Sequence, residues 1–287
     1  MAPLPTTADL LSAALEALAA PHGPAPDART RQLEAELLLA HVLDAPRARL
    51  KSHPEEPRSA GERGCYLALV ERRRAGEPLA YLVGRKAFWS LDLSVGPQVL
   101  VPRPETELLV ERALALRPEP TGTAADLGTG SGAIALALAS ERPGWQITAT
   151  DLSEEALRIA RHNASRLGAR NVQLLHGDWF APLAARRVHL VVSNPPYIAG
   201  GDPVLAAPPL VYEPRMALSP GRDPMTHLLA IIRTAPRHLE PGGWLLLEHG
   251  ATQAEDVARE LVARGFNHVR SHRDLAGHAR MTEARWE

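Results

Sequence analysis

The tetrapeptide Asn194-Pro195-Pro196-Tyr197 directly follows residues 188–193, an apolar run that is typical of a buried strand. Each proline fixes its φ angle and lacks an N–H donor, which leaves the backbone carbonyl oxygens of Asn194 and Pro195 available as acceptors. The side-chain oxygen of Asn194 adds another acceptor, and the Tyr197 ring supplies an aromatic wall. These groups suit an NH2 group that is conjugated to a π system, whose nitrogen lone pair is delocalised and weakly nucleophilic.

Acceptors that hold both N–H bonds of such a group near the tetrahedral directions favour a pyramidal nitrogen. The tetrapeptide then fits a transition state better than the planar ground state. The Tyr197 ring stacks on the planar substrate and fixes its approach to a methyl donor. No strong base is needed before attack, because the methylated nitrogen becomes acidic and loses its proton afterwards. We therefore predict methyl transfer, with Asn194, Pro195 and Tyr197 as catalytic residues and Pro196 as a further substrate contact. The structural alternative is a proline-proline loop that ends a strand.

A glycine-rich turn, Asp126-Leu127-Gly128-Thr129-Gly130-Ser131-Gly132, lies where an expected strand meets an expected helix. Glycines let the backbone turn sharply and approach a ligand closely, and the helix N-terminus offers N–H groups to a carboxylate. The spacing is Gly-x-Gly-x-Gly after an aspartate, whereas a dinucleotide fingerprint has Gly-x-Gly-x-x-Gly. This spacing favours a cofactor with an amino-acid tail and no phosphates. The candidate cofactor-binding residues of the turn are Gly128, Thr129, Gly130, Ser131 and Gly132.

Acidic residues follow the next two expected strands. Asp151 ends the second strand and is placed to accept hydrogen bonds from both hydroxyls of a ribose. Asp178 and Trp179 follow the third strand, where the carboxylate suits an adenine amino group and the indole packs on the ring. Each has an ordinary alternative, Asp151 as a helix cap and Trp179 as a core residue. Together with the glycine turn they predict S-adenosylmethionine as the methyl donor, converted to S-adenosylhomocysteine, with Asn194 beside it and no metal.

The elements that position these residues alternate between strand and helix from about residue 122 onward. This alternation predicts an α/β fold with a doubly wound, mainly parallel sheet, the fold of S-adenosylmethionine-dependent methyltransferases. The expected strands are 123–127, 147–150, 172–175, 188–193, 244–248 and 266–271. The expected helices are 105–116, 133–139, 154–167, 225–239 and 255–264.

Residues 1–84 show helical periodicity and little strand signal, which predicts a small helical bundle. Residues 85–104 are expected to form a β-hairpin linker, and residues 105–287 the methyltransferase domain. In the bundle we expect Thr7 as a helix N-cap, Cys65 as a small core residue and His41 as a packing histidine. Arg72-Arg73-Arg74 is expected to be a solvated helix end. Prolines at 21, 24, 26, 46, 54 and 57 are expected to break helices.

The composition limits the remaining function classes. The net charge is −1 and the sequence pI about 6.9, which argues against a protein held mainly by nucleic-acid phosphates. Cys65 is the single cysteine, so an intramolecular disulfide is impossible. Neither a signal peptide nor the roughly 18 uncharged apolar residues of a membrane span is apparent. We expect a cytoplasmic monomer that does not act at a membrane.

Several motifs resemble those of the peptide chain release factor N5-glutamine methyltransferases over about residues 80–287. They are Phe88-Trp89, Leu100-Val101-Pro102-Arg103-Pro104-Glu105-Thr106-Glu107, the glycine turn, Gly177-Asp178-Trp179, Ser193 to Ile198, Glu213-Pro214 and Leu247-Glu248-His249-Gly250. The helical N-terminal part is similar in character more than in motif. The sequence departs from the family at Asp223-Pro224-Met225, where an Asp-Gly-Leu-like run is usual.

The resemblance implies that the substrate is the glutamine of the Gly-Gly-Gln motif in bacterial-type class 1 release factors. It implies that Gly128 to Gly132, Asp151, Trp179 and Asn194 bind the cofactor and that Asn194 to Tyr197 hold the glutamine side chain. Phe88 and Arg103 would wall the substrate pocket, the helical domain would contact the release factor, and the hairpin would act as a hinge.

Three other functions stay open at this point. An adenine N6-methyltransferase acting on nucleic acid uses a similar tetrapeptide but predicts a basic recognition region, which the near-neutral charge disfavours. A second alternative is a methyltransferase that acts on a glutamine of a ribosomal protein, and the motif at residues 100–107 does not distinguish it from a release factor methyltransferase. A non-catalytic, cofactor-binding scaffold is disfavoured by the intact tetrapeptide.

Overall fold

The computed structural model describes residues 4–19 and 27–287. The chain divides into two compact units, one up to Arg85 together with Ala206–Tyr212, and one made of Lys86–Leu205 and Glu213–Glu287. Residues 206–212, which we expected in the methyltransferase domain, belong to the first unit. The hairpin belongs to the second unit from Lys86 onward.

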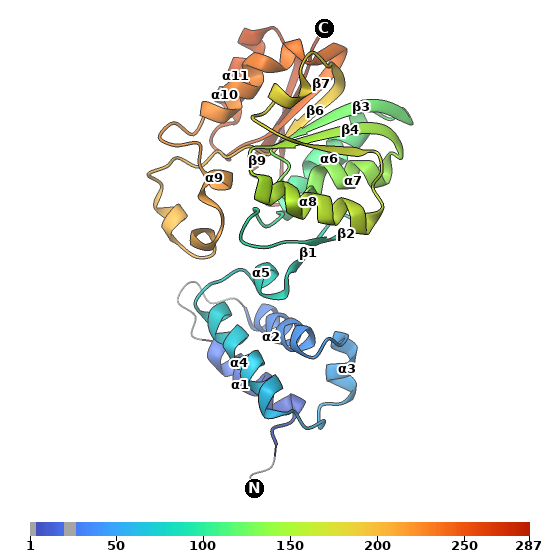
Figure 1. Cartoon of the computed structure of the whole chain (residues 1–287). Helices are drawn as coiled ribbons and strands as arrows, with labels where there is room; N and C mark the ends of the chain where they lie inside the picture. The colour runs from blue at the N-terminus through green and yellow to red at the C-terminus, as the bar shows by residue number, and fades with distance from the viewer. Residues whose placement is uncertain (1–3, 20–26) are drawn as a thin grey trace. The chain divides into compact units, whose positions relative to one another are not determined.

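The first unit is helical (Figure 1). Its elements are α1 (Thr7–Leu18), α2 (Ala28–Val42), α3 (Arg47–Ser52), α4 (Ala60–Arg74), α5 (Leu79–Val83) and the 3-10 helix η4 (Leu210–Tyr212). Leu10, Leu38 and Tyr66 belong to its core and are at most 2% exposed. The buried Tyr66 hydroxyl donates to the Ala35 carbonyl at 3.1 Å, which ties α4 to α2 and satisfies the polar end of a core ring.

Three expectations for this unit are wrong. Thr6, not Thr7, caps α1, because Thr6 has an extended backbone and its hydroxyl accepts from the Asp9 N–H. Cys65 is exposed, since α4 directs its neighbour Tyr66 into the core instead. His41 is exposed rather than packed. The prolines at 21, 24 and 26 lie outside the described residues.

Ion pairs order the end of α4. Arg72 pairs with Glu77, Arg73 with Glu34 and Arg74 with Glu71. Of the acids, Glu34 is only 8% exposed, so its pair with Arg73 compensates a charge that would otherwise be buried alone. The three arginines therefore act in part as structural groups within the unit.

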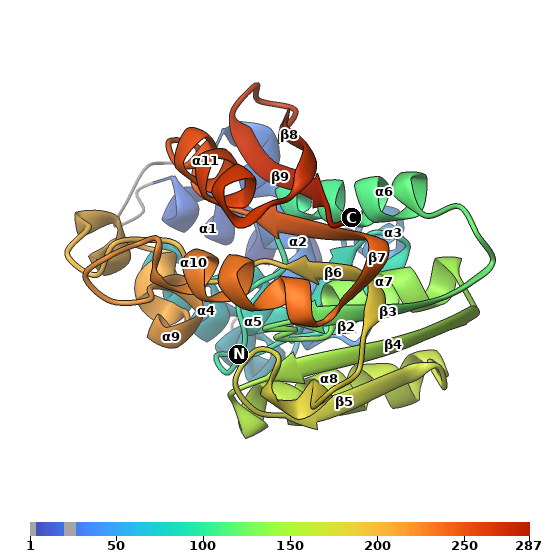
Figure 2. The ribbon, with the colours of Figure 1, turned by 90° about the horizontal axis from the view of Figure 1, so that it is seen from above.

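The second unit is built on one twisted sheet in the order β5-β4-β3-β6-β7-β9-β8 (Figure 2). The strands are β3 (Thr121–Leu127), β4 (Gly144–Asp151), β5 (Val172–His176), β6 (Val188–Ser193), β7 (Leu239–Glu248), β8 (Asn267–Arg273) and β9 (Ala279–Arg285). Pairs from β5 to β7 are parallel, and β9 is antiparallel to both β7 and β8. The predicted doubly wound, mainly parallel sheet is confirmed.

Helices cover both faces of this sheet. Apolar residues of α6 (Glu107–Leu116), α7 (Ala133–Glu141) and α8 (Glu154–Leu167) share a core with β3, β4 and β6. Residues of α10 (Thr226–Thr234) and α11 (Ala254–Arg264) form a second core with the opposite faces of β3, β6 and β7. Shorter helices are α9 (Arg215–Leu218), η1 (Pro104–Thr106), η2 (Ala181–Leu183), η3 (Pro203–Ala206) and η5 (Ala235–Arg237).

The hairpin consists of β1 (Arg85–Phe88) and β2 (Leu91–Ser94), so it is shorter than the expected range 85–104, and residues 99–101 are irregular. The expected helix 225–239 is also too long, because α10 ends at Thr234 and β7 already begins at Leu239. Pro241-Gly242-Gly243 lies inside β7 at a register shift against β6, with Gly242 at φ +82°. A bulge of this kind accommodates residues that would otherwise break a strand.

Strand β9 was not predicted. Of its four buried residues, Met281 and Ala284 are apolar and Thr282 and Glu283 are polar. Thr282 contacts the buried His249 ring, while Glu283 receives two hydrogen bonds from Arg112 of α6. Within the described residues, no helix combines the length and apolar character required to cross a bilayer.

Substitutions at two neighbouring residues of α11 test which face of this helix is buried in the second core. Leu261 is fully buried in the second core, whereas Val262 is 61% exposed. Leu261→Ala should lower the free energy of unfolding by about 3 kcal/mol, because it removes apolar contacts and leaves a cavity. Val262→Ala should change it by less than about 0.5 kcal/mol. Urea unfolding of both variants measures this, and equal losses would contradict the assigned orientation of α11.

Candidate active site

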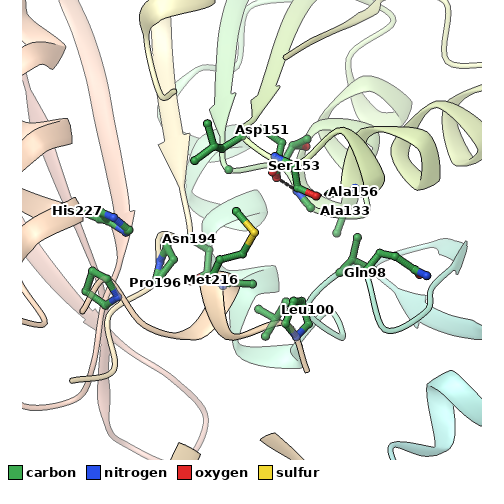
Figure 3. A pocket seen from close by; sticks show the side chains of 18 of the residues that line it. Gln98, Leu100, Ala133, Asp151, Ser153, Ala156, Asn194, Pro196, Met216 and His227 are labelled. Carbon is green, nitrogen blue, oxygen red and sulfur yellow. Dashed lines mark hydrogen bonds between the residues drawn. The ribbon is translucent and has the colours of Figure 1, made fainter. Parts of the chain in front are cut away.

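A cavity of about 430 Å³ opens in the second unit at the carboxyl ends of β3, β4, β5 and β6. The strand order reverses between β3 and β6, and open parallel sheets bind ligands at such a reversal. Figure 3 shows Asp151, Asn194 and Met216 around a common space, although they come from β4, from the residue after β6 and from α9. Residues 98–106 and 214–221 contribute further walls.

The glycine turn requires its glycines for distinct reasons. Gly128, Gly130 and Gly132 have φ angles of +73°, +57° and +86°, where a side chain is strained. A Cβ on Gly128 would also lie 3.2 Å from the Trp179 ring. The Gly130 N–H donates to the Asp151 carboxylate at 2.8 Å, so the turn after β3 is joined to the end of β4.

Asp126, near the end of β3, holds the same turn by hydrogen bonds. Its carboxyl is fully buried and accepts from the Thr129 hydroxyl at 2.6 Å and from the Ala135 N–H at 3.1 Å. Burial raises the pKa of Asp126 to about 7, against the opposing effect of these hydrogen bonds. Burial also raises the pKa of Asp151, opposed by the N–H groups of Ser153 and Gly130.

An aromatic wall stands beside the acidic groups. Trp179 lines the cavity, and the Thr150 hydroxyl donates to its carbonyl oxygen at 2.9 Å. The His227 ring meets Trp179 edge-on at 5.2 Å and also lines the cavity. Burial lowers the pKa of His227, opposed by the charge of Asp178. Among the described residues its Nδ1 atom has no hydrogen-bond partner.

The tetrapeptide is fixed through the end of its strand. The Ser193 hydroxyl donates to the Leu127 carbonyl at 2.7 Å, which aligns the end of β6 with the glycine turn after β3. The Asn194 side-chain N–H donates to Thr106 Oγ1 at 3.2 Å. The Tyr197 hydroxyl donates to Glu248 at 3.2 Å, and its carbonyl accepts from Gln253 at 3.2 Å.

Arg103 lines the cavity and pairs with the buried Glu213, which also accepts from the Val101 N–H at 3.0 Å. Phe88, which the resemblance assigned to the pocket wall, is 1% exposed and packs in the first core, away from the cavity lining. Burial of its aromatic ring in the core that α6, α7 and α8 share with the sheet stabilises the fold, so the position of Phe88 indicates a structural role.

The cavity collects most, but not all, of the predicted site residues. Those that line it are Arg103, Gly128, Thr129, Gly130, Asp151, Asp178, Trp179, Asn194 and Pro196. Ser131, Gly132, Pro195 and Tyr197 stand behind this lining, and the Tyr197 ring packs against the second core. Their expected roles remain predictions.

Four further residues, Thr106, Glu213, Glu248 and His227, lie at or beside the site but were not predicted. Thr106, Glu213 and Glu248 occur in the motifs that carried the resemblance, yet no role was given to them. Nothing in the sequence singled out His227, which lies close to the departure at Asp223-Pro224-Met225.

The charges fit a cationic cofactor without phosphates. The titratable residues among the described lining are Arg103, Asp151, Asp178 and His227. The Gly130 N–H, which a phosphate would need, is already held by the Asp151 carboxylate. A phosphate at this turn would face that negative charge, whereas ribose hydroxyls and a positively charged sulfur would be stabilised by it.

Two family models match the chain. One, described as the methyltransferase small domain, matches residues 104–223, and another, the PrmC N-terminal domain, matches residues 10–84. The chain is 49% identical to the release factor glutamine methyltransferase of Pseudomonas aeruginosa over 263 residues, 91% of this chain and 95% of that protein. It is 48% identical to the enzyme of the same description from Coxiella burnetii over 258 residues, 90% of this chain and 92% of that protein.

A solved structure supports the fold. The 16S rRNA N2 G1207 methyltransferase of T. thermophilus, in complex with AdoMet and guanosine, has a TM-score of 0.52 and 20% identity. The match covers 71% of this chain and 50% of that one. At this identity the likeness shows the methyltransferase fold alone.

The buried Asp126 predicts a pH dependence of stability. Its pKa is about 7 in the fold against 3.8 ordinarily, so in this window the folded chain holds a proton that the unfolded chain has released. Raising the pH through the window therefore lowers the free energy of unfolding. Asp126→Asn removes this titration, so its stability relative to the native chain should rise between about pH 5 and about pH 8. Urea unfolding at both pH values measures the difference, and a constant difference would refute the assignment.

Proposed function

This chain belongs to the release factor glutamine methyltransferase family, and we propose that it methylates N5 of the glutamine in the Gly-Gly-Gln motif of peptide chain release factors, with S-adenosylmethionine as donor. The observation that carries the proposal is the placement of Asn194 on the cavity that Asp151, Asp178 and Trp179 also line. A group that grips a planar NH2 then lies beside groups that suit an adenosyl cofactor.

The chain's own residues would hold the donor at the ends of three strands. When bound, S-adenosylmethionine supplies a methyl group on a positively charged sulfur. Asp151 would accept from the ribose hydroxyls, since each of its oxygens holds one backbone N–H and keeps a further lone pair. Asp178 would accept from the adenine amino group, and Trp179 would pack on the adenine ring.

Asn194 and Pro195 would hold the substrate amide. The Asn194 side-chain N–H is taken by Thr106, which leaves the Oδ1 atom to accept one substrate N–H. The Pro195 carbonyl would accept the other, and Pro196 would contact the planar amide. Two acceptors at a nitrogen that becomes tetrahedral stabilise the transition state more than the ground state, so no basic side chain is required for attack.

The first unit would bind the release factor. Its match to a separate N-terminal family model over residues 10–84 supports a role distinct from that of the catalytic unit. The near-neutral charge disfavours a nucleic-acid acceptor. We further propose that the chain works as a monomer in the cytoplasm, because release factors act on ribosomes there.

Acceptor choice is tested directly. The native chain is incubated with labelled S-adenosylmethionine and, separately, a release factor, its Gln→Ala variant, ribosomal particles and DNA. We expect label only in the release factor that keeps its glutamine. Label in ribosomal protein or in DNA, and none in the release factor, would assign one of the alternative acceptors instead.

Asn194→Ala should lower kcat about 100-fold or more, because it removes an acceptor that strengthens in the transition state. The free energy of unfolding should change little, since Asn194 is only partly buried. Steady-state methylation of a release factor measures kcat, with Val262→Ala as a surface control that should match the native chain. Near-normal kcat in Asn194→Ala would contradict the mechanism.

Asp178→Ala should weaken S-adenosylmethionine binding about tenfold, the loss of one hydrogen bond to a charged acceptor. Glu255→Ala, which removes an exposed acid from α11, is the matched control and should leave binding unchanged. Calorimetric titration with S-adenosylmethionine, and with NAD as the competing cofactor class, measures both. Equal affinities of the two variants, or tighter binding of NAD, would count against the assigned cofactor site.

A further inference from the structure

A buried carboxylate lies behind the tetrapeptide. Glu248, at the end of β7, is 1% exposed. One of its oxygens accepts from the Thr106 hydroxyl at 2.7 Å, and the other accepts from the Tyr197 hydroxyl at 3.2 Å. Thr106 Oγ1 in turn accepts from the Asn194 side-chain N–H at 3.2 Å. A single carboxylate thus reaches both ends of the tetrapeptide.

The direction of these hydrogen bonds follows from the charge. An ionised carboxylate only accepts, so the hydroxyls of Thr106 and Tyr197 must both donate to it. The proton of Thr106 is then committed, and its oxygen presents lone pairs to Asn194. The amide of Asn194 consequently turns its N–H toward Thr106 and leaves Oδ1 available on the cavity that Asn194 lines.

We propose that Glu248 is a positioning residue, which acts through Thr106 to set the orientation of the Asn194 amide and directly to hold Tyr197. The inference rests on the proposed function, because only a reaction at a substrate N–H requires Asn194 to present an acceptor. Glu248 itself does not reach the reacting atoms.

A protonated Glu248 would reverse the direction. It could donate to Thr106, whose hydroxyl could then donate to Asn194 Oδ1, turning the Asn194 N–H toward the substrate N–H. The groups that face Glu248 are Thr106, Tyr197, Arg280 of β9 and Glu105 of η1. Burial raises the pKa of Glu248 to about 7 and Glu105 adds to this, whereas Thr106, Tyr197 and Arg280 favour the ionised form. The kcat of the native chain should therefore fall as the pH drops below about 7.

The test compares near-isosteric variants with labelled S-adenosylmethionine and a release factor. Glu248→Gln carries one NH2 donor, so it cannot accept from both hydroxyls in the native way. We expect kcat to fall about 30-fold or more while both KM values stay within about threefold, and the acidic limb of the kcat profile to disappear. Thr106→Val should show a similar loss, Thr106→Ser should restore most of it, and the Thr106→Val/Glu248→Gln pair should be no worse than either alone.

Glu283→Gln is the matched control, since Glu283 is also a buried acid of this sheet but pairs with Arg112 away from the cavity. It should lower stability yet leave kcat of the folded protein within about twofold. Native kcat and an unchanged pH profile in Glu248→Gln would overturn the inference and leave the proposed function standing. If Glu248→Gln fails to fold, a native kcat in Thr106→Val would likewise overturn the inference. A native chain that labels no release factor removes the proposed function, and this inference falls with it.

Discussion

The pairing of β3 with β6 is the constraint on which the rest of the site depends. These strands mark the reversal of strand order, and the Ser193 hydroxyl locks the end of β6 to the Leu127 carbonyl. The glycine turn and the tetrapeptide therefore leave the sheet side by side, although Gly132 and Asn194 are 62 positions apart in the sequence. The proposed cofactor-binding turn and the proposed amide-binding tetrapeptide border one cavity because parallel strands end at a common edge.

Buried acids hold this edge together at some cost in stability. Asp126 and Glu248 are both at most 1% exposed, and burial raises the pKa of each to about 7. Neither forms an ion pair in the described part of the chain. Asp126 Oδ2 accepts from a hydroxyl and an N–H group, while its Oδ1 atom has no hydrogen-bond partner among the described residues, and Glu248 accepts from two hydroxyls. Neutral side chains at these two positions would cost less free energy to bury. They would not fix the direction of the neighbouring hydrogen bonds, whereas an ionised carboxylate only accepts. Polarity is what both acids contribute, Asp126 to the turn and Glu248 to the tetrapeptide.

The sequence predicted what depends on local pattern. The alternation of strand and helix patterns predicted the doubly wound sheet. The end of each strand can be recognised from its own local sequence pattern, so the residues at the strand ends predicted the position of the cavity. Errors arose where neighbours in space decide the outcome. Phe88 was assigned to the pocket but is taken up by the core, and Cys65 was assigned to the core although α4 turns it outward. Strand β9 escaped notice because its buried polar residues find partners on other elements.

The positioning groups were invisible for the same reason. Thr106 and Glu248 are 142 positions apart, and Thr106 and Asn194 are 88 positions apart. Each appears in the sequence as an ordinary polar residue near the end of an element, Thr106 in η1 and Glu248 in β7. What matters is the direction of donors and acceptors in the series of hydrogen bonds from Glu248 through Thr106 to Asn194. This series forms only when the folded sheet places η1 next to the ends of β6 and β7. A motif therefore tells which atoms can grip a substrate, whereas the direction in which they face is decided by the buried charge behind them.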